Sequence, residues 1–239
     1  MSRLLLAILV AVVLALTVTG CAAVPAPAAP AITVTAATSG PSAALAQLAV
    51  KGRAPATGYS RAQFGPGWVD VDRDGCDQRN DVLARDLTDV TFKPGTHDCV
   101  VTTGTLVDPY TGRTIEFVRG ARTSSAVQID HVVSLSDAWQ TGAQQLDAAT
   151  RVQLANDLGN LLAVDGPTNE SKGDGDAATW LPPARGFWCS YASRQVEIKA
   201  RYRLWVTPAE HDALARALAG CPALSPAGLA VASGYGGAS

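Results

Sequence analysis

Three short segments near the middle of the chain contain polar side chains suited to metal-assisted hydrolysis. A neutral imidazole can take a proton from water near neutral pH, so we expect His131 to be the general base. Asp130 and Asn169 offer the hard oxygen ligands that Mg²⁺ prefers, so we expect them to bind a divalent cation. The segments are Ile129-Asp130-His131-Val132-Val133, Asp157-Leu158-Gly159-Asn160-Leu161-Leu162 and Thr168-Asn169-Glu170-Ser171-Lys172-Gly173.

In their order along the chain and in their local sequences, these segments resemble the HNH superfamily of nucleases. The likeness covers roughly residues 59–221 and looks closest to the nuclease domain at the C-terminal end of GmrSD-type restriction enzymes and to its small secreted relatives. It implies a ββα-metal (HNH, or His-Me finger) core that cleaves DNA or RNA with one divalent cation, expected to be Mg²⁺. It also implies that Asn160 hydrogen-bonds the backbone of the loop bearing His131 and so orients the ring.

The chain departs from that family pattern at two positions. Ser134 stands where many relatives have Pro, and the last position is Asn169 rather than His, which leaves the metal preference open. Lys172 follows Asn169 by one helical turn, and we hypothesise that it contacts the substrate phosphate, the alternative being a solvated lysine. Arg79 is a second hypothesised substrate-binding residue.

A separate acidic segment resembles the first half of a calcium loop. Asp70-Val71-Asp72-Arg73-Asp74-Gly75 follows the pattern D-x-D-x-D-G, and Asp81 stands where a bidentate Glu is expected. The hypothesis is a Ca²⁺ site formed by Asp70, Asp72, Asp74 and Asp81. The alternative is an acidic turn held by a disulfide at Cys76.

The elements that must position these groups are those of an α+β domain with added helices and an N-terminal β-hairpin. Residues 100–118 predict the hairpin, because two β-rich runs flank turn residues at 108–112. Thr207-Pro208-Ala209-Glu210 predicts a capping box that opens the last helix. The pattern further predicts strands at 126–129 and 161–164 and helices at 80–87, 134–144, 147–158, 191–205 and 207–218.

The charge balance argues against simple electrostatic attraction to DNA. The chain has 19 Lys+Arg and 21 Asp+Glu, a formal net charge of −2, so a nuclease would depend on its metal for positive charge at the phosphate. Residues 185–203, which include Lys199, hold five bases and one acid. They are the best local candidate for a face that binds the nucleic-acid backbone, the alternative being a solvated helix face.

Four of the cysteines are expected to be paired, because export implies an oxidising compartment. No two of them have the C-x-x-C spacing of a zinc site, so two disulfides are expected among Cys76, Cys99, Cys189 and Cys221. Three pairings are open, and we favour Cys76–Cys99 with Cys189–Cys221 because each pair brackets a local unit.

The ends of the chain predict export. Residues 1–21 read as a lipoprotein signal peptide whose lipobox cysteine, Cys21, is lipidated and anchors the protein to a membrane. A plain secretory leader and an uncleaved anchor are the alternatives. An Ala/Pro/Thr-rich flexible tether (22–48), the nuclease-like domain (49–221) and a flexible tail (222–239) follow. Two rival functions are a non-catalytic, calcium-binding surface module with the same fold and another metal-dependent hydrolase of the cell envelope.

Overall fold

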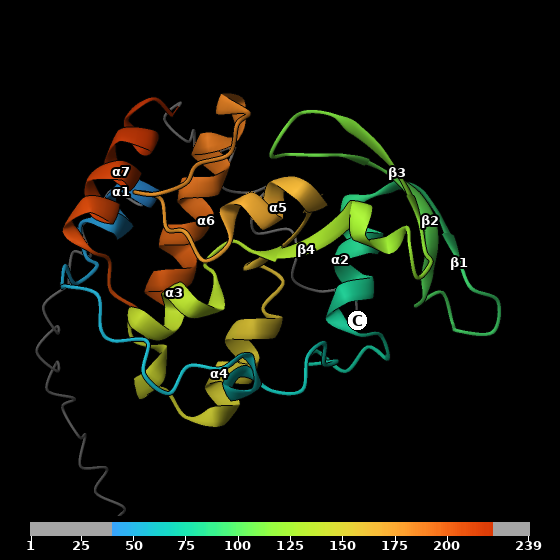
Figure 1. The fold of residues 1–239 in the computed structure, drawn as a ribbon, viewed down its shortest axis with the longest axis horizontal. Helices are drawn as coiled ribbons and strands as arrows, with labels where there is room; N and C mark the ends of the chain where they lie inside the picture. The colour runs from blue at the N-terminus through green and yellow to red at the C-terminus, as the bar shows by residue number, and fades with distance from the viewer. Residues whose placement is uncertain (1–39, 222–239) are drawn as a thin grey trace, which may run out of the picture. The chain divides into compact units, whose positions relative to one another are not determined.

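The computed structural model of this chain describes residues 40–221 (Figure 1). The predicted signal peptide, its Cys21, most of the predicted tether and the predicted tail lie outside the described residues. The last part of the expected tether is folded, because Pro41–Leu45 form helix α1. Leu45 is buried among residues of helices α6 (Trp188–Arg201) and α7 (Pro208–Ala219). The folded unit therefore begins before residue 49. Between residues 40 and 221, no helix is both long and apolar enough to cross a membrane.

The fold is α+β, as predicted, and the predicted hairpin is one edge of a three-stranded antiparallel sheet. The strand order is β1-β2-β3, with β1 at Thr88–Phe92, β2 at Val101–Val107 and β3 at Thr114–Val118. Gly112, at φ 76°, and the Asp108 side chain shape the turn between β2 and β3. Strand β1 was not predicted, because it is mostly exposed and only Val90 and Phe92 mark an apolar alternation.

A second sheet pairs two strands that are far apart in the sequence. β4 (Val127–His131) runs antiparallel to β5 (Leu161–Asp165), and His131 is opposite Leu161. Helix α5 (Gly166–Lys172) follows β5 directly and contacts both strands. The Asp165 carboxylate caps this helix by accepting a hydrogen bond from the Thr168 backbone N–H, and Pro167 occupies its first turn. The result is a strand–strand–helix unit.

Capping side chains begin most of the remaining helices. Asp77, Ser134 and Asp147 each accept a backbone hydrogen bond at a helix N-terminus, and Thr207 and Glu210 form the predicted capping box. The helix predicted from residue 134 ends early, because Gly142 adopts φ 132° and a 3₁₀ turn follows. The capped helices are α2 (Gln78–Asp86), α3 (Leu135–Gln140), α4 (Ala148–Asn156) and α7 (Pro208–Ala219), while α6 (Trp188–Arg201) has no capping side chain.

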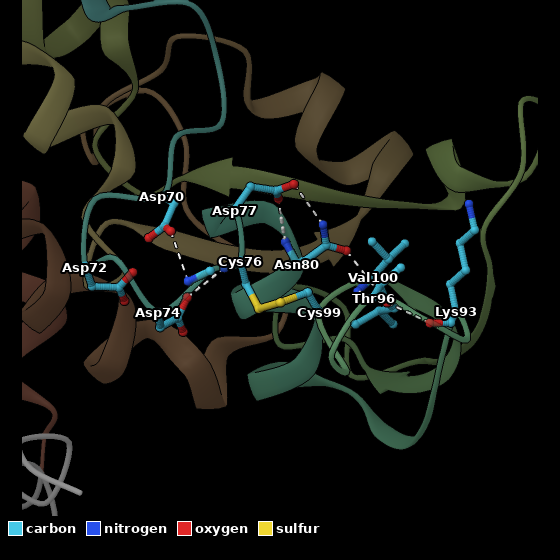
Figure 2. The surroundings of a disulfide bond; sticks show 12 residues. Asp70, Asp72, Asp74, Cys76, Asp77, Asn80, Lys93, Thr96, Cys99 and Val100 are labelled. Atoms are coloured by element: carbon cyan, nitrogen blue, oxygen red, sulfur yellow. Dashed lines mark hydrogen bonds between the residues drawn. A yellow bond between two sulfur atoms is a disulfide. The ribbon is translucent and has the colours of Figure 1, made fainter. Parts of the chain in front are cut away.

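Both favoured disulfides form. Cys76–Cys99 joins the start of α2 to the segment before β2, as Figure 2 shows, and Cys189–Cys221 joins α6 to the residue after the C-cap of α7. Helices α1, α6 and α7 pack together (Figure 1), and the second disulfide lies within this group. Each crosslink restricts the unfolded chain and contributes about 3 kcal/mol to stability.

A buried cluster of ion pairs lies where α3, α6 and α7 meet. The Lys199 ammonium lies 2.9 Å from Asp137 and 2.6 Å from Glu210, and Arg53 pairs with Asp137 and Asp176. The Lys199 side chain is fully buried. The prediction of a basic face at residues 185–203 is therefore wrong for two of its five bases. Lys199 faces the core, and Arg201 is paired with Asp157.

Candidate active site

Strand β4 and helix α5 bring the main predicted site residues to one cavity. Asp130, His131 and Asn169 all line a hollow of about 390 Å³. His131 ends β4, and Asn169 lies on α5, which packs against β4. The further polar or charged lining residues are Tyr59, Arg61, Gln128, Ser134, Ser136, Glu170 and Asp174. Segments more than thirty residues apart in the sequence thus meet at a single pocket.

The Asp130 carboxylate is buried, and each of its oxygens accepts one hydrogen bond from a side chain. Its Oδ1 accepts a hydrogen bond from the Lys172 ammonium at 2.8 Å, and its Oδ2 accepts one from the Tyr110 hydroxyl. Burial raises the pKa of Asp130, while the charge and hydrogen bond of Lys172 and the hydrogen bond of Tyr110 oppose that rise. Each carboxylate oxygen still has a second lone pair, so Asp130 can also bind a cation.

Lys172 has a different environment from the one that the sequence suggested. Both earlier interpretations, a phosphate contact and a solvated lysine, assumed an exposed ammonium. In the structure the Lys172 side chain is buried, and its ammonium donates to Asp130 and to the backbone carbonyl of His131, each at 2.8 Å. The residue therefore neutralises Asp130 and ties α5 to the end of β4.

The His131 ring is held in one orientation. Its Nε2 lies 2.8 Å from the Ala155 carbonyl, and because a carbonyl can only accept, Nε2 carries the proton of the neutral ring. Nδ1 therefore holds the free lone pair. The indole of Trp68 stacks on the imidazole, with centroids 5.9 Å apart and an interplanar angle of 7°. Burial lowers the pKa of His131 to about 3, so the ring is neutral at physiological pH.

Asn160 makes the backbone contacts predicted for it. Its Oδ1 accepts a hydrogen bond from the Val133 N–H at 2.8 Å, and its Nδ2 donates to the Val133 carbonyl at 3.2 Å. Its own carbonyl accepts from the Val132 N–H. The side chain is completely buried. Asn160 thus fixes the two residues that follow His131.

The oxygen-bearing side chains that line the cavity are of the types that a hard divalent cation prefers. The Asn169 amide donates through Nδ2 to Gln128 Oε1 at 2.9 Å, which orients its Oδ1. Glu170 accepts from Gln128, and Asp174 accepts from Ser136. Carboxylate and amide oxygens are the ligands that Mg²⁺ favours, often together with several waters. Asp130 and Asn169 could thus hold such an ion, with Glu170 and Asp174 adding negative charge nearby.

Arg79 lies apart from this cavity. It belongs to the first turn of α2, and it is not among the residues that line the hollow around His131. Burial and the charge of Arg119 lower its pKa. A role for Arg79 in binding substrate therefore requires a nucleic acid that extends beyond the cavity.

Asp70, Asp72 and Asp74 of the acidic segment lie before α2, beside the Cys76–Cys99 disulfide (Figure 2). Oxygen atoms of these three carboxylates lie within 4.8 Å of one another, and Asp81 forms a similar group with Asp74 and the disulfide-bonded Cys76. Asp81 Oδ2 is buried without a hydrogen-bond partner in the described part of the chain. Burial and the neighbouring carboxylates raise the pKa of Asp81 to about 7.

Sequence reasoning did not identify three residues of the site. Arg61 lines the cavity, Trp68 stacks on His131, and Tyr110 binds Asp130. Tyr110 lies in a turn, Arg61 begins a short 3₁₀ turn and Trp68 lies in a bend, and none of them belongs to a recognisable motif. Only the tertiary fold places them beside the Asp-His pair.

Comparison with known proteins supports the relation that the motifs suggested. Residues 77–217 match the family model described as "GmrSD restriction endonucleases, C-terminal domain". An "Uncharacterized secreted protein" of Arthroderma benhamiae is 39% identical over 188 residues, which cover 76% of this chain and 87% of that protein. No solved structure matches the chain.

Proposed function

Since this chain belongs to the family of the C-terminal domain of GmrSD restriction endonucleases, we propose that it is a secreted HNH-type endonuclease that hydrolyses phosphodiester bonds, with DNA as the expected substrate. The observation that carries the proposal is the shared cavity of Asp130, His131 and Asn169 at the strand–strand–helix unit. We identify this unit with the ββα-metal core of such enzymes. RNA is the alternative substrate.

In this proposal His131 acts as the general base. Its Nδ1 lone pair takes a proton from a water molecule, and the oxygen of that water attacks phosphorus on the side opposite the leaving oxygen. The phosphorus–oxygen bond to the leaving group breaks, and the leaving oxygen takes a proton from solvent. The Ala155 carbonyl keeps Nε2 protonated, and Asn160 holds the backbone after His131 in place. A divalent cation, Mg²⁺ in this proposal, would be held by Asp130 and Asn169 and would supply positive charge at the phosphate.

A plasmid-cleavage assay tests the proposal. We expect the full chain to cleave plasmid with Mg²⁺, to lose activity in a chelator, and to lose at least about 10³-fold in rate in His131→Ala. His211→Ala is the matched control, because His211 lies on α7 and does not line the cavity. Full activity in His131→Ala would reject the assignment, and failure to cleave DNA or RNA with any of several divalent metals would favour a non-catalytic binding module.

We also propose that the acidic segment binds calcium, because its carboxylates converge and Asp81 Oδ2 has no partner within residues 40–221. Binding to the folded state alone raises the melting temperature. Calcium should therefore raise the Tm of the wild type but not of Asp74→Asn, while exposed Asp89→Asn serves as the control. A Tm indifferent to calcium would exclude the site.

We propose further that Cys21 is lipidated and anchors the exported protein to a membrane. Cys21 follows the apolar run and small residues of a lipobox, and a lipid-modified terminus would hold the protein at a membrane surface. Cys21→Ser should shift the protein from the membrane fraction to the soluble fraction. An unchanged distribution would leave a plain secretory leader as the better interpretation.

A further inference from the structure

The segment at residues 59–69, here called the aromatic segment, precedes the residues matched by the family model and packs firmly on the domain. Phe64 is almost completely buried, and its ring lies 6.3 Å from both Tyr59 and Trp139, edge-on to each. Tyr59 and Trp139 also lie 6.2 Å apart. Three mutually packed rings anchor the segment to α3, which contains Trp139.

Hydrogen bonds and a close backbone approach fix the rest of the aromatic segment. Arg151 of α4 donates through Nε to the Gln63 carbonyl at 2.8 Å, and the Val69 N–H donates to Asn156 Oδ1 at 3.0 Å. Gly65 adopts φ 97°, and a Cβ at this position would lie 2.9 Å from Val152 Cγ2. The segment is therefore a defined part of the fold, and Arg61 starts its 3₁₀ turn, Arg61–Phe64.

This packing places two residues of the aromatic segment, Arg61 and Trp68, near His131, the proposed general base. Trp68 covers one face of the His131 ring. Arg61 lines the 390 Å³ cavity with Asp130, His131 and Asn169, and it also lines a smaller hollow of about 80 Å³ that Trp68 and His131 share. Arg61 is thus the residue of the segment that borders both spaces together with His131.

The negatively charged residues that line the cavity would repel a phosphate group unless a cation lies beside them. Asp130, Glu170 and Asp174 line it, and Lys172 is buried in its ion pair with Asp130. Arg61 is the one Lys or Arg among the lining residues. Within the part of the chain that the structure describes, its guanidinium makes no ion pair or side-chain hydrogen bond, and the residue is exposed. A free guanidinium can bind a phosphate through two parallel N–H···O bonds.

We propose that Arg61 binds the substrate phosphate beside His131, so that the aromatic segment, although outside the family-matched residues, completes the active site. This inference rests on the proposed nuclease function. It names a phosphate-binding residue for that site in place of Lys172, whose ammonium is already held by Asp130.

The experiment compares Arg61→Ala, Arg61→Lys and Arg216→Ala in the full chain. Arg216 is an exposed arginine on α7 that lines neither hollow, so it controls for the loss of one positive charge. Cleavage of a labelled DNA duplex is measured with Mg²⁺. Binding of the same duplex is measured in a chelator by fluorescence anisotropy at several salt concentrations, with His131→Ala included. Thermal melting shows whether each variant is folded.

We expect Arg61→Ala to lower kcat/KM by about 100-fold and Arg61→Lys by about 10-fold, because lysine keeps the charge but loses the paired donors. The slope of log K against log salt should fall by about one for Arg61→Ala. Arg216→Ala should match the wild type in both, and His131→Ala should bind with the wild-type slope while it fails to cleave.

Two results separate failure of this inference from failure of the proposed function. Suppose that the wild type cleaves DNA and that folded Arg61→Ala cleaves and binds like Arg216→Ala. Arg61 is then not a phosphate ligand, although the proposed nuclease function holds. If the wild type binds but does not cleave, the salt slopes still decide whether Arg61 contacts phosphate. If the wild type neither binds nor cleaves, both proposals fall together.

Discussion

The Lys172 ammonium donates a hydrogen bond to the Asp130 carboxylate at 2.8 Å, and both side chains are buried. The two residues are 42 positions apart in the chain, so the pair forms only when α5 packs against β4. A buried carboxylate left without its cation is costly, because burial removes the water that would stabilise its charge.

Lys172→Met should therefore lower the free energy of unfolding by about 3–5 kcal/mol. The double variant Asp130→Asn with Lys172→Met should lose clearly less, because it leaves no unpaired charge behind. Urea unfolding of the wild type, both single variants and the double variant gives the coupling energy. A single Lys172→Met variant as stable as the wild type would contradict the ion pair.

Asn160→Ala should impair both folding and cleavage. It removes hydrogen bonds to the Val133 backbone and leaves those buried groups without partners, which costs about 1–3 kcal/mol. Because the same bonds hold the loop after His131, we expect a loss of about 10–100-fold in kcat. Asn80→Ala is the matched control, since Asn80 is also buried and hydrogen-bonds a backbone N–H, at Val101, outside the cavity. Equal losses of kcat in the two variants would argue against a positioning role for Asn160.

The pKa of His131 can be measured directly by NMR. Burial lowers it to about 3, and Trp68 covers one face of the ring. Trp68→Ala should admit water and raise this pKa toward the ordinary value of about 6.5, whereas Trp68→Phe, which keeps an aromatic ring there, should leave it low. A depressed pKa contributes stability that is lost as the pH falls from 6.5 toward 3. An unchanged His131 titration in Trp68→Ala would show that the indole does not shield the ring.

Glu210 should give the opposite dependence of stability on pH. Burial, opposed by Lys199, raises its pKa from 4.5 to about 7. The folded state therefore binds this proton more tightly than the unfolded state, so the Glu210 contribution to stability is present at low pH and is lost as the pH rises from 4.5 to about 7. Glu210→Gln should unfold with a smaller pH dependence over this range. Exposed Glu197→Gln is the control and should keep the wild-type dependence.

Local sequence signals predicted the parts of the fold that local chemistry determines. The capping box at Thr207 and Glu210 and the turn at 108–112 follow from nearby residues, and the structure contains them. Both disulfides have the pairing that was favoured among the three possible ones. The strands around Asp130 and Asn160 were predicted from short apolar runs. Boundaries failed where a single residue changed the backbone, as at Gly142.

The remainder depends on tertiary contacts that no local pattern contains. Lys172 and Lys199 were predicted as solvated or substrate-facing groups, because lysine is rarely buried. Both are paired with acids from distant segments, Asp130 in one case and Asp137 with Glu210 in the other. Arg61 belongs to no recognisable motif, and the packing of the aromatic segment brings it to the cavity.

The two crosslinks set practical limits for expressing this protein in pieces. Cys76 precedes and Cys221 follows the family-matched residues 77–217, so a fragment cut at those ends would keep one member of each pair. Cys99 and Cys189 would then be free thiols that can bond to each other or to a second molecule. The same fragment would lack Arg61 and Trp68. A lack of activity in this fragment would therefore not show that the full chain is inactive.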